Sequence, residues 1–215
     1  ISSLDRSKLD NTADTVFYQE PKLVTHTDEG FIQQLQDLYA QKLTGDNLKI
    51  LDFMSSHVSH LPKAVLNRLD RLDVHGMNAH ELELNPARQA TNGTSFLRDL
   101  NAQSNFIGLC NDETYDALLC CVGIQYLQQP EAVLADAARI LRPGGVIIIS
   151  FTNRFFYQKA LQGWLNRGMK ERGRLVQDYL RAAGAFDNIQ VVGEGTTAWA
   201  RLSSRAGSGG DPCVA

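Results

Sequence analysis

Apolar positions along the chain follow two spacings, one typical of buried strands and one typical of amphipathic helices. Tyr115–Cys121 is a short, mostly apolar run, as expected of a strand that is covered on both faces. From Pro130 to Leu141 the apolar residues recur at helical spacing, and proline suits the first turn of such a helix. The Pro-Gly-Gly sequence at 143–145 predicts a turn, and Val146–Phe151 a second strand. This order is a right-handed crossover unit of an α/β sheet.

The same alternation covers most of the chain. Further strands are expected at Leu48–Met54, Arg71–Met77 and Ser95–Asp99, and further helices at Gly30–Leu43, Pro62–Leu69, Ala79–Leu84 and Phe155–Ala183, the last broken near Gly168. Ile189–Val192 and Thr196–Leu202 are expected to close the sheet as an antiparallel pair. We therefore predict an α/β fold with a seven-stranded, mostly parallel sheet and helices on both faces, in which Leu48–Met54 and Tyr115–Cys121 are parallel neighbours.

Length and composition fit one domain. A chain of 215 residues with 43% hydrophobic and 21% charged residues is ordinary for a globular α/β unit. The net charge of −3 argues against non-specific nucleic-acid binding as the main role. No apolar run approaches the roughly 20 residues that span a bilayer.

The two ends differ from the middle of the chain. Residues 1–29 are expected to form an extended segment, 30–202 the domain, and 203–215 a tail rich in glycine and serine, a composition that usually stays mobile. The sequence begins with Ile1, so we expect either that a targeting peptide has been removed or that a segment is missing. Both ends are candidate surfaces for protein partners.

Cysteine placement favours reduced thiols. Cys120 and Cys121 are adjacent in an expected strand and would point to opposite faces, which is a poor arrangement for a disulfide. We interpret these two and Cys110 and Cys213 as reduced residues rather than redox or metal-binding groups.

The segment YDALLCCVGIQYL…PEAVLADAARILRPGGVIIISF resembles the second half of the class I S-adenosylmethionine-dependent methyltransferase fold. In that Rossmann-like family an FD-x-V strand and an R-x-LKPGG turn occur in the same order. The resemblance implies the fold described above, S-adenosylmethionine as cofactor and methyl transfer as activity.

The cofactor turn departs from the family pattern. The first strand ends in Asp52, and the family then has a turn of the type D-x-G-x-G-x-G, whereas Met54, Ser56 and Val58 stand at the glycine positions here. Glycine permits positive φ and a close approach of the backbone to the ligand. These side chains either reshape the turn or fill the pocket. After the second strand, Asn78 stands where the family has an acid for the ribose hydroxyls.

A narrower resemblance covers roughly residues 16–202. FYQEPKLVTHTDEGFIQQLQDLY, ILDFMSSHVSHLP, GMNAHELELNP and DLNAQ are together similar to a poorly characterised, type 11-like methyltransferase group of photosynthetic lineages. This resemblance implies that the Met-Ser-Ser turn is a trait of the group. It also implies a location in the plastid or another organelle, with the cytoplasm as the alternative.

Motif positions predict the site residues. Cofactor contacts are expected from the ends of four strands: Asp52, Met54, Ser55, Ser56, Asn78, Asp99, Leu100, Cys121 and Val122. Substrate contacts are expected from the loops beyond the first, fourth and fifth strands: His57, Gln125, Tyr126, Asn153 and Arg154. His57-x-x-His60 lacks nearby cysteine or acidic residues in a recognisable zinc pattern, so no metal site is expected.

Two functions remain open at this point. One is an S-adenosylmethionine-dependent methyltransferase acting on a small molecule or a plastid component. No catalytic residue follows from the fold for this function, because the sulfonium carries its own leaving group. The other is a catalytically inactive subunit of a larger complex. In that case residues 54–58 should occlude the cofactor cavity, and residues 1–29 and 203–215 should lie against other chains.

Overall fold

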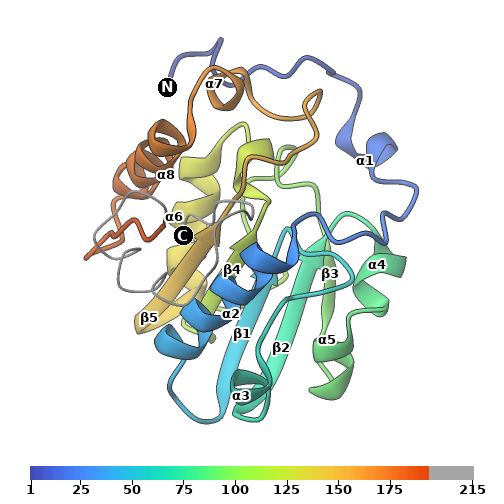
Figure 1. Cartoon of the computed structure of the whole chain (residues 1–215), viewed down its shortest axis with the longest axis vertical. Helices are drawn as coiled ribbons and strands as arrows, with labels where there is room; N and C mark the ends of the chain where they lie inside the picture. The colour runs from blue at the N-terminus through green and yellow to red at the C-terminus, as the bar shows by residue number, and fades with distance from the viewer. Residues whose placement is uncertain (194–215) are drawn as a thin grey trace.

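The computed structural model describes residues 1–193, and its centre is a parallel β-sheet. Five strands lie in the order β3-β2-β1-β4-β5, and every neighbouring pair is parallel (Figure 1). Their bounds are β1 Leu48–Phe53, β2 Leu69–Gly76, β3 Ser95–Leu97, β4 Tyr115–Cys121 and β5 Leu141–Ser150. The prediction that the first and fourth strands are parallel neighbours is confirmed, since Ile50, Leu51 and Asp52 pair with Ala117, Leu118 and Leu119.

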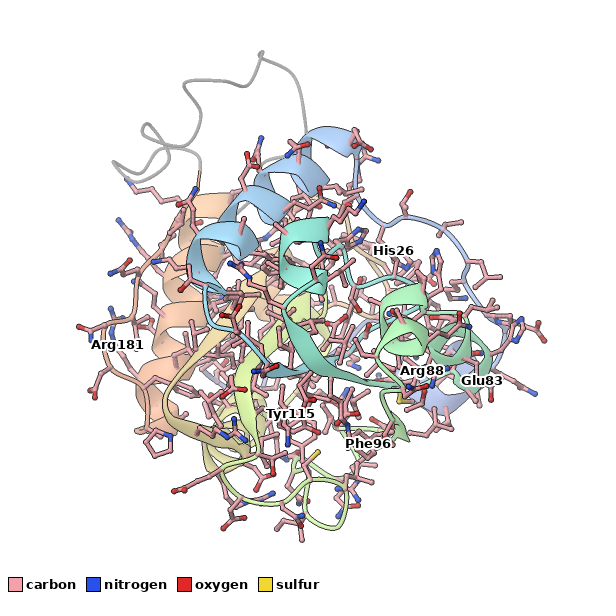
Figure 2. All side chains as sticks on the ribbon, turned by 90° about the horizontal axis from the view of Figure 1, so that it is seen from below. His26, Glu83, Arg88, Phe96, Tyr115 and Arg181 are labelled. Carbon is pink, nitrogen blue, oxygen red and sulfur yellow. The ribbon has the colours of Figure 1, made fainter. Side chains whose placement is uncertain are left out.

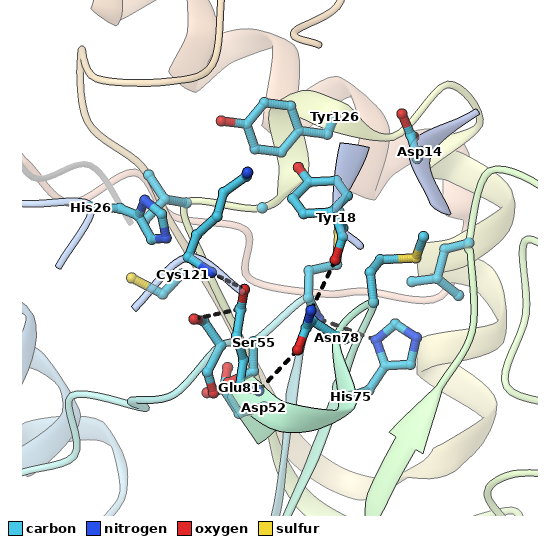
Figure 3. A pocket seen from close by; sticks show the side chains of 18 of the residues that line it. Asp14, Tyr18, His26, Asp52, Ser55, His75, Asn78, Glu81, Cys121 and Tyr126 are labelled. Atoms are coloured by element: carbon cyan, nitrogen blue, oxygen red, sulfur yellow. Dashed lines mark hydrogen bonds between the residues drawn. The ribbon is translucent and has the colours of Figure 1, made fainter. Parts of the chain in front are cut away.

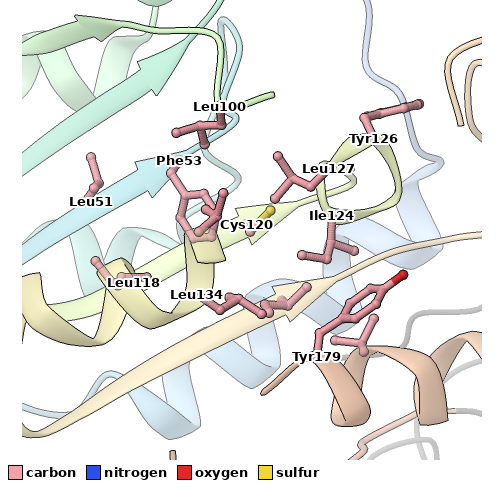
Figure 4. Packing of buried hydrophobic residues seen from close by; sticks show 14 of the residues in the cluster. Leu51, Phe53, Leu100, Leu118, Cys120, Ile124, Tyr126, Leu127, Leu134 and Tyr179 are labelled. Atoms are coloured by element: carbon pink, nitrogen blue, oxygen red, sulfur yellow. The ribbon is translucent and has the colours of Figure 1, made fainter. Parts of the chain in front are cut away.

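Helices cover both faces of the sheet, as predicted. α2 (Glu29–Lys42) packs on one face, where its Phe31, Leu35 and Tyr39 join strand residues such as Ile50 in one buried cluster. α6 (Pro130–Ile140) and α8 (Met169–Ala183) cover the other face and share a second cluster with residues such as Phe53 and Leu118 (Figure 4). Because strand side chains alternate between faces, successive residues of β1 and β4 contribute to different clusters. Tyr115, labelled in Figure 2, is buried at 2% exposure, whereas Arg181 lies at the outer surface of the molecule in the same view.

Short helices connect these layers. They are α1 Asp14–Phe17, α3 Lys63–Leu66, α4 Ala79–Glu83, α5 Pro86–Ala90 and α7 Gln162–Leu165, with a 3₁₀ turn at Ile124–Tyr126. The sequence interpretation missed α5, although Asn85 caps it by accepting hydrogen bonds from the N–H groups of Ala87 and Arg88, and Pro86 fills its first position.

Two expected elements differ from the structure. The Pro-Gly-Gly sequence lies within β5 as a bulge, because Gly144 has φ +79° and the pairing shifts from Tyr115–Leu141 to Ala117–Val146. No helix begins at Phe155, because nearby backbone N–H groups bond elsewhere: Phe156 N–H donates to the Tyr126 hydroxyl and Leu161 N–H to the Gln125 carbonyl. The helical region is interrupted at Gly168, the N-cap of α8, as expected.

The strand count was predicted as seven, and residues 1–193 contain five strands. Ile189–Val192 is not a strand. Its expected partner, Thr196–Leu202, lies outside the described residues, as do the tail 203–215 and Cys213.

The thiols of Cys110, Cys120 and Cys121 are free, and Cys120 and Cys121 face opposite clusters. Within residues 1–193 no helix has the length and apolarity to cross a membrane.

The N-terminal segment, residues 1–28, runs along the upper end of the sheet in Figure 1 and contacts its own domain. Arg6 forms a two-point ion pair with Glu131 of α6, at 2.7 and 2.9 Å, and Lys8 forms an antiparallel bridge with Leu161. The Lys159 ammonium is fully buried beneath the segment and donates to the Thr12 carbonyl at 2.5 Å. Residues far apart in sequence therefore join this segment to the rest of the domain.

Candidate functional site

A cavity of about 280 Å³ opens at the carboxyl ends of the strands, where open α/β sheets bind their ligands (Figure 3). All nine residues expected to contact the cofactor line it. β1 and its turn contribute Asp52, Met54, Ser55 and Ser56. β2 is followed by Asn78, β3 by Asp99 and Leu100, and β4 ends in Cys121 and is followed by Val122. The topology therefore brings residues from four separate sequence segments into one wall.

The turn after β1 has the left-handed backbone conformation that glycine adopts easily, but a methionine occupies it. Met54 has φ +55°, which costs a non-glycine residue about 1–2 kcal/mol. Its N–H donates to His75 Nδ1 at 3.2 Å, and Ser55 N–H donates to the His75 carbonyl at 2.7 Å. Strained backbone of this kind persists where surrounding contacts fix it, often at functional sites. The turn after β1 therefore keeps a left-handed residue, although Met54 stands in place of glycine.

Two other glycines make room for this turn. A Cβ atom on Gly76 would lie 2.7 Å from the Ser55 carbonyl oxygen, and a Cβ atom on Gly123 would lie 2.7 Å from Met54 Cβ. Both distances are too short for real side chains. The Met-Ser-Ser and Gly-Met-Asn motifs are therefore packed against each other, and Gly123 leaves space for the Met54 side chain.

Gly76→Ala is expected to lower the free energy of unfolding by about 1–3 kcal/mol, the usual cost of overpacking. The new methyl group meets a backbone oxygen, which cannot rotate away as a flexible side chain could. Urea unfolding followed by circular dichroism measures the change. A variant as stable as the wild type would contradict the close contact between the two motifs.

Asp52 is the buried carboxylate of the site. Its exposed fraction is 2%, and its Oδ2 accepts a hydrogen bond from the Ser55 hydroxyl at 2.6 Å. Burial raises the pKa of Asp52 to about 6, although hydrogen bonds from Ser55 and Ser59 favour the ionised form. At neutral pH the carboxylate is ionised, so it offers a negative charge to a cationic ligand group.

His75 connects the ends of β1, β2 and β3. Its Nδ1 accepts from Met54 N–H, and its Nε2 lies 3.1 Å from the Arg98 carbonyl oxygen. This pattern requires a neutral ring with the proton on Nε2. Burial lowers the pKa of His75 to about 4, so the ring stays neutral at physiological pH. We assign His75 a structural role in shaping the turn, which sequence analysis missed.

Glu81 is a further residue of the site that sequence analysis missed. Asn78 caps α4 by accepting from Glu81 N–H at 3.1 Å, so the Glu81 side chain starts one helical turn after Asn78. Its carboxylate is 6% exposed, lines the cavity and accepts from the Ser56 hydroxyl at 2.7 Å. The Asn-x-x-Glu spacing is a capping pattern, and it could have indicated an acid in this first turn.

The β3 and β4 ends complete the wall. Asp99 Oδ1 accepts from Asn101 N–H at 2.8 Å, which fixes the loop after β3. Val122 has φ +52°, a rare conformation for a β-branched residue, and its N–H bonds the Ser150 carbonyl at 2.8 Å. Burial raises the pKa of the Cys121 thiol to about 12. Cys121 is thus a neutral wall residue and not a thiolate nucleophile.

The five expected substrate residues separate into two groups. Tyr126 and Arg154 line the cavity, whereas His57, Gln125 and Asn153 do not. Gln125 is 1% exposed and donates to the Val122 carbonyl at 2.8 Å, so its amide holds the loop after β4. His57 Nδ1 lies 3.1 Å from the Ser56 hydroxyl, and Asn153 is exposed.

The N-terminal segment supplies cavity residues that no sequence motif indicated. They are Asp14, Tyr18, Lys22 and His26. The Lys22 ammonium lies 4.6 Å from the centroid of the Phe17 ring, within the range of a cation–π contact. Phe156, from the loop after β5, contacts Phe17, His26 and Tyr126 through its ring. This side of the cavity therefore has an aromatic cluster beside the Asp14 carboxylate and the Lys22 ammonium. Within residues 1–193 no three metal-ligating side chains gather as a site.

Comparison with known proteins agrees with this geometry. A family model described as a methyltransferase domain matches residues 40–149, from α2 to β5. The chain belongs to the methyltransferase-domain family. No curated protein matches the sequence.

Solved structures support the fold at low sequence identity. A S-adenosylmethionine-dependent methyltransferase from Leishmania major aligns with a TM-score of 0.58 and 13% identity, over 86% of this chain and 70% of that one. The [4+2]-cyclase SpnF aligns with a TM-score of 0.57 and 12% identity, over 93% and 89%. A Haloferax volcanii methyltransferase, solved with its Trm112 activator, gives 0.53 and 14%, over 86% and 89%.

These alignments concern the fold, because one fold hosts several chemistries. In another alignment this chain spans 50% of the length of the protein that it matches. The activity therefore has to be argued from the cavity.

Proposed function

We propose that this protein binds S-adenosylmethionine in the cavity and transfers its methyl group to a small molecule. The observation that carries the proposal is the convergence of all nine expected cofactor residues on one cavity, around a turn that keeps the left-handed conformation at Met54. A chain that had lost the site would have no reason to retain this strained backbone.

The polar groups of the cavity match the parts of this cofactor. Asp52 would hold the α-ammonium group, assisted by the Ser55 hydroxyl beside it. Asn78 and Glu81 would face the ribose hydroxyls, and Asp99 with Leu100 would flank the adenine. The three carboxylates also favour a ligand that carries positive charge at its sulfur. The fit needs no glycine at the turn, because Met54 already has positive φ.

The bound sulfonium supplies both the methyl group and its leaving group, so the chain has to position the acceptor and exclude water. Tyr126, Phe156 and Arg154 form the wall on the acceptor side. The N-terminal segment also contributes residues to this wall, and we propose a small molecule as the acceptor.

Calorimetry on the full chain tests the cofactor. S-adenosylmethionine and its demethylated product, S-adenosylhomocysteine, are expected to bind with Kd values between about 1 μM and 1 mM, the range in which enzymes usually hold their substrates. The two ligands share the adenosine and amino-acid groups that the cavity recognises. No heat of binding for either ligand at millimolar concentration would reject the proposal.

The inactive-subunit alternative required residues 54–58 to occlude the cavity. Met54, Ser55, Ser56 and Val58 instead line a cavity of about 280 Å³. That alternative also placed residues 1–29 against other chains, whereas this segment contacts its own domain. The open cavity favours the enzyme, and a failure to bind either ligand would favour the subunit.

A further inference from the structure

We infer that the backbone of residues 18–22, here termed the latch, occupies the hydrogen-bonding positions of the cofactor ribose and must leave them when the cofactor binds. This inference rests on the proposed function and adds regulation to it: the N-terminal segment would inhibit the site in its own chain.

The latch contacts two side chains at the start of α4, the helix that follows β2. Asn78 Nδ2 donates to the carbonyl oxygens of Tyr18 and Gln19, both at 3.0 Å, and Lys22 N–H donates to Glu81 Oε1 at 2.6 Å (Figure 3). The latch thus presents acceptors to an amide and a donor to a carboxylate. A ribose diol presents the same set, because each hydroxyl both donates and accepts.

These contacts use the polar groups that the ribose needs. An asparagine amide has two N–H donors, and both are directed to the latch. Asn78 Oδ1 is occupied by Glu81 N–H at the start of α4, and Glu81 Oε2 by the Ser56 hydroxyl. A ribose that binds Asn78 Nδ2 therefore has to displace the carbonyl groups of Tyr18 and Gln19.

The size of the cavity agrees with a partly closed site. Small-molecule sites usually measure about 300–1,000 Å³, and this cavity, at about 280 Å³, lies just below that range. Tyr18 and Lys22 are part of its wall. Movement of the latch would enlarge the cavity on the side where Asn78 and Glu81 lie.

The N-terminal segment is held firmly before the latch, near Arg6 and Thr12. Residues 19–27, which include most of the latch, are held less firmly. Arg6 and the Thr12 region are held by Glu131 and the buried Lys159. Residues 19–27 have no regular secondary structure, and Leu23 and Val24 are 46% and 57% exposed. A tethered segment competes at high effective concentration, and a stretch with few buried contacts opens at low free-energy cost.

Lys22→Pro and Lys22→Ala form a matched pair that tests the latch. Both variants lose the side chain, but only proline removes the N–H that donates to Glu81. Lys22→Pro is expected to bind S-adenosylhomocysteine about three- to tenfold more tightly than Lys22→Ala, the equivalent of one hydrogen bond. Equal affinities, or weaker binding by the proline variant, would overturn the latch.

Hydrogen–deuterium exchange on the unmodified full chain provides a second measurement. Saturating S-adenosylhomocysteine is expected to increase the exchange of the amides in residues 18–24, because the latch leaves Asn78 and Glu81. Slower exchange in these residues would mean that the segment closes over the ligand, which contradicts the inference. Absence of binding by the wild type and both variants would instead reject the proposed function.

Discussion

Replacing Asp52 by asparagine is expected to lower the affinity for S-adenosylmethionine about 10- to 100-fold at neutral pH. A hydrogen bond to a charged group contributes roughly 1.5–3 kcal/mol, and each 1.4 kcal/mol corresponds to a factor of about ten. The change keeps the shape of the side chain and an oxygen that can accept from Ser55, so it removes mainly the charge. Calorimetry at several pH values measures the effect.

The pH dependence of cofactor affinity separates the effect of the Asp52 charge from the effect of the side chain's shape. As the pH falls through about 6, the buried Asp52 carboxylate takes up a proton and loses its attraction for the ammonium group. Affinity of the wild type is therefore expected to fall over this interval, and affinity of Asp52→Asn to remain nearly constant. Identical pH profiles for the two proteins would show that Asp52 does not hold the cofactor.

Asp52→Asn is expected to lower the cofactor affinity but to raise the free energy of unfolding above pH 6. A carboxyl group with a pKa raised from 3.8 to about 6 binds its proton more tightly in the folded state, so it disfavours folding increasingly as the pH rises through this range. Above pH 6, Asp52→Asn should therefore unfold at a higher urea concentration than the wild type. Weak binding by a more stable variant separates a lost contact from a damaged fold.

Asp116→Asn is the matched control. Asp116 lies at the amino end of β4, at the opposite edge of the sheet, where it accepts from Lys49 N–H and pairs with Arg142 at 2.6 Å. The same loss of charge there is expected to leave cofactor affinity unchanged.

Most of the sheet could be predicted because its signals are local. The run Tyr115–Cys121 is apolar because both faces of β4 are buried, and the periodicity from Pro130 reflects one face of α6 against the sheet. The carboxyl ends of parallel strands meet at one edge, so residues placed by motif, such as Asp52 and Asn78, also came together in the structure.

The failures have non-local causes. The stretch after Phe155 has helical composition, but the Tyr126 hydroxyl and the Gln125 carbonyl accept from its N–H groups. The Pro-Gly-Gly sequence is a turn signal, yet the ladder between β4 and β5 continues past it through a bulge. In both segments, hydrogen bonds to residues distant in sequence determine the backbone conformation, and the spacing of residues along the sequence does not reveal those partners.

The candidate site was incomplete for the same reason. Glu81 reaches the cavity only because Asn78 caps α4, which turns the carboxylate towards Ser56. Lys22 and His26 reach it from a segment whose sequence has no strong periodicity. Their positions follow from the attachment of residues 1–28 to the domain, in which the buried Lys159 is one of several contacts.

Lys159→Met is expected to lower the free energy of unfolding by about 1–3 kcal/mol, the usual cost of leaving a buried hydrogen-bonding group without its partner. The Lys159 ammonium is fully buried and lies 3.1 Å from Asp10 Oδ2 and 3.4 Å from Asp14 Oδ1. Methionine fills much of the space but leaves the Thr12 carbonyl and the two carboxylates without this cation. Thermal unfolding should shift by on the order of 5 °C for a chain of this size.

Lys170→Met is the matched control, because Lys170 is exposed on α8 and exposed substitutions usually change stability by less than about 0.5 kcal/mol. If Lys159 also anchors the latch, Lys159→Met should increase amide exchange throughout residues 8–24 under conditions where the sheet stays folded. Asp14 keeps Lys8 at 2.6 Å and Asn101 at 2.9 Å, so the segment is expected to loosen rather than detach. Unchanged stability and unchanged exchange would mean that the ion pairs of Lys159 do not attach the segment. The latch would then be held only by its hydrogen bonds to Asn78 and Glu81.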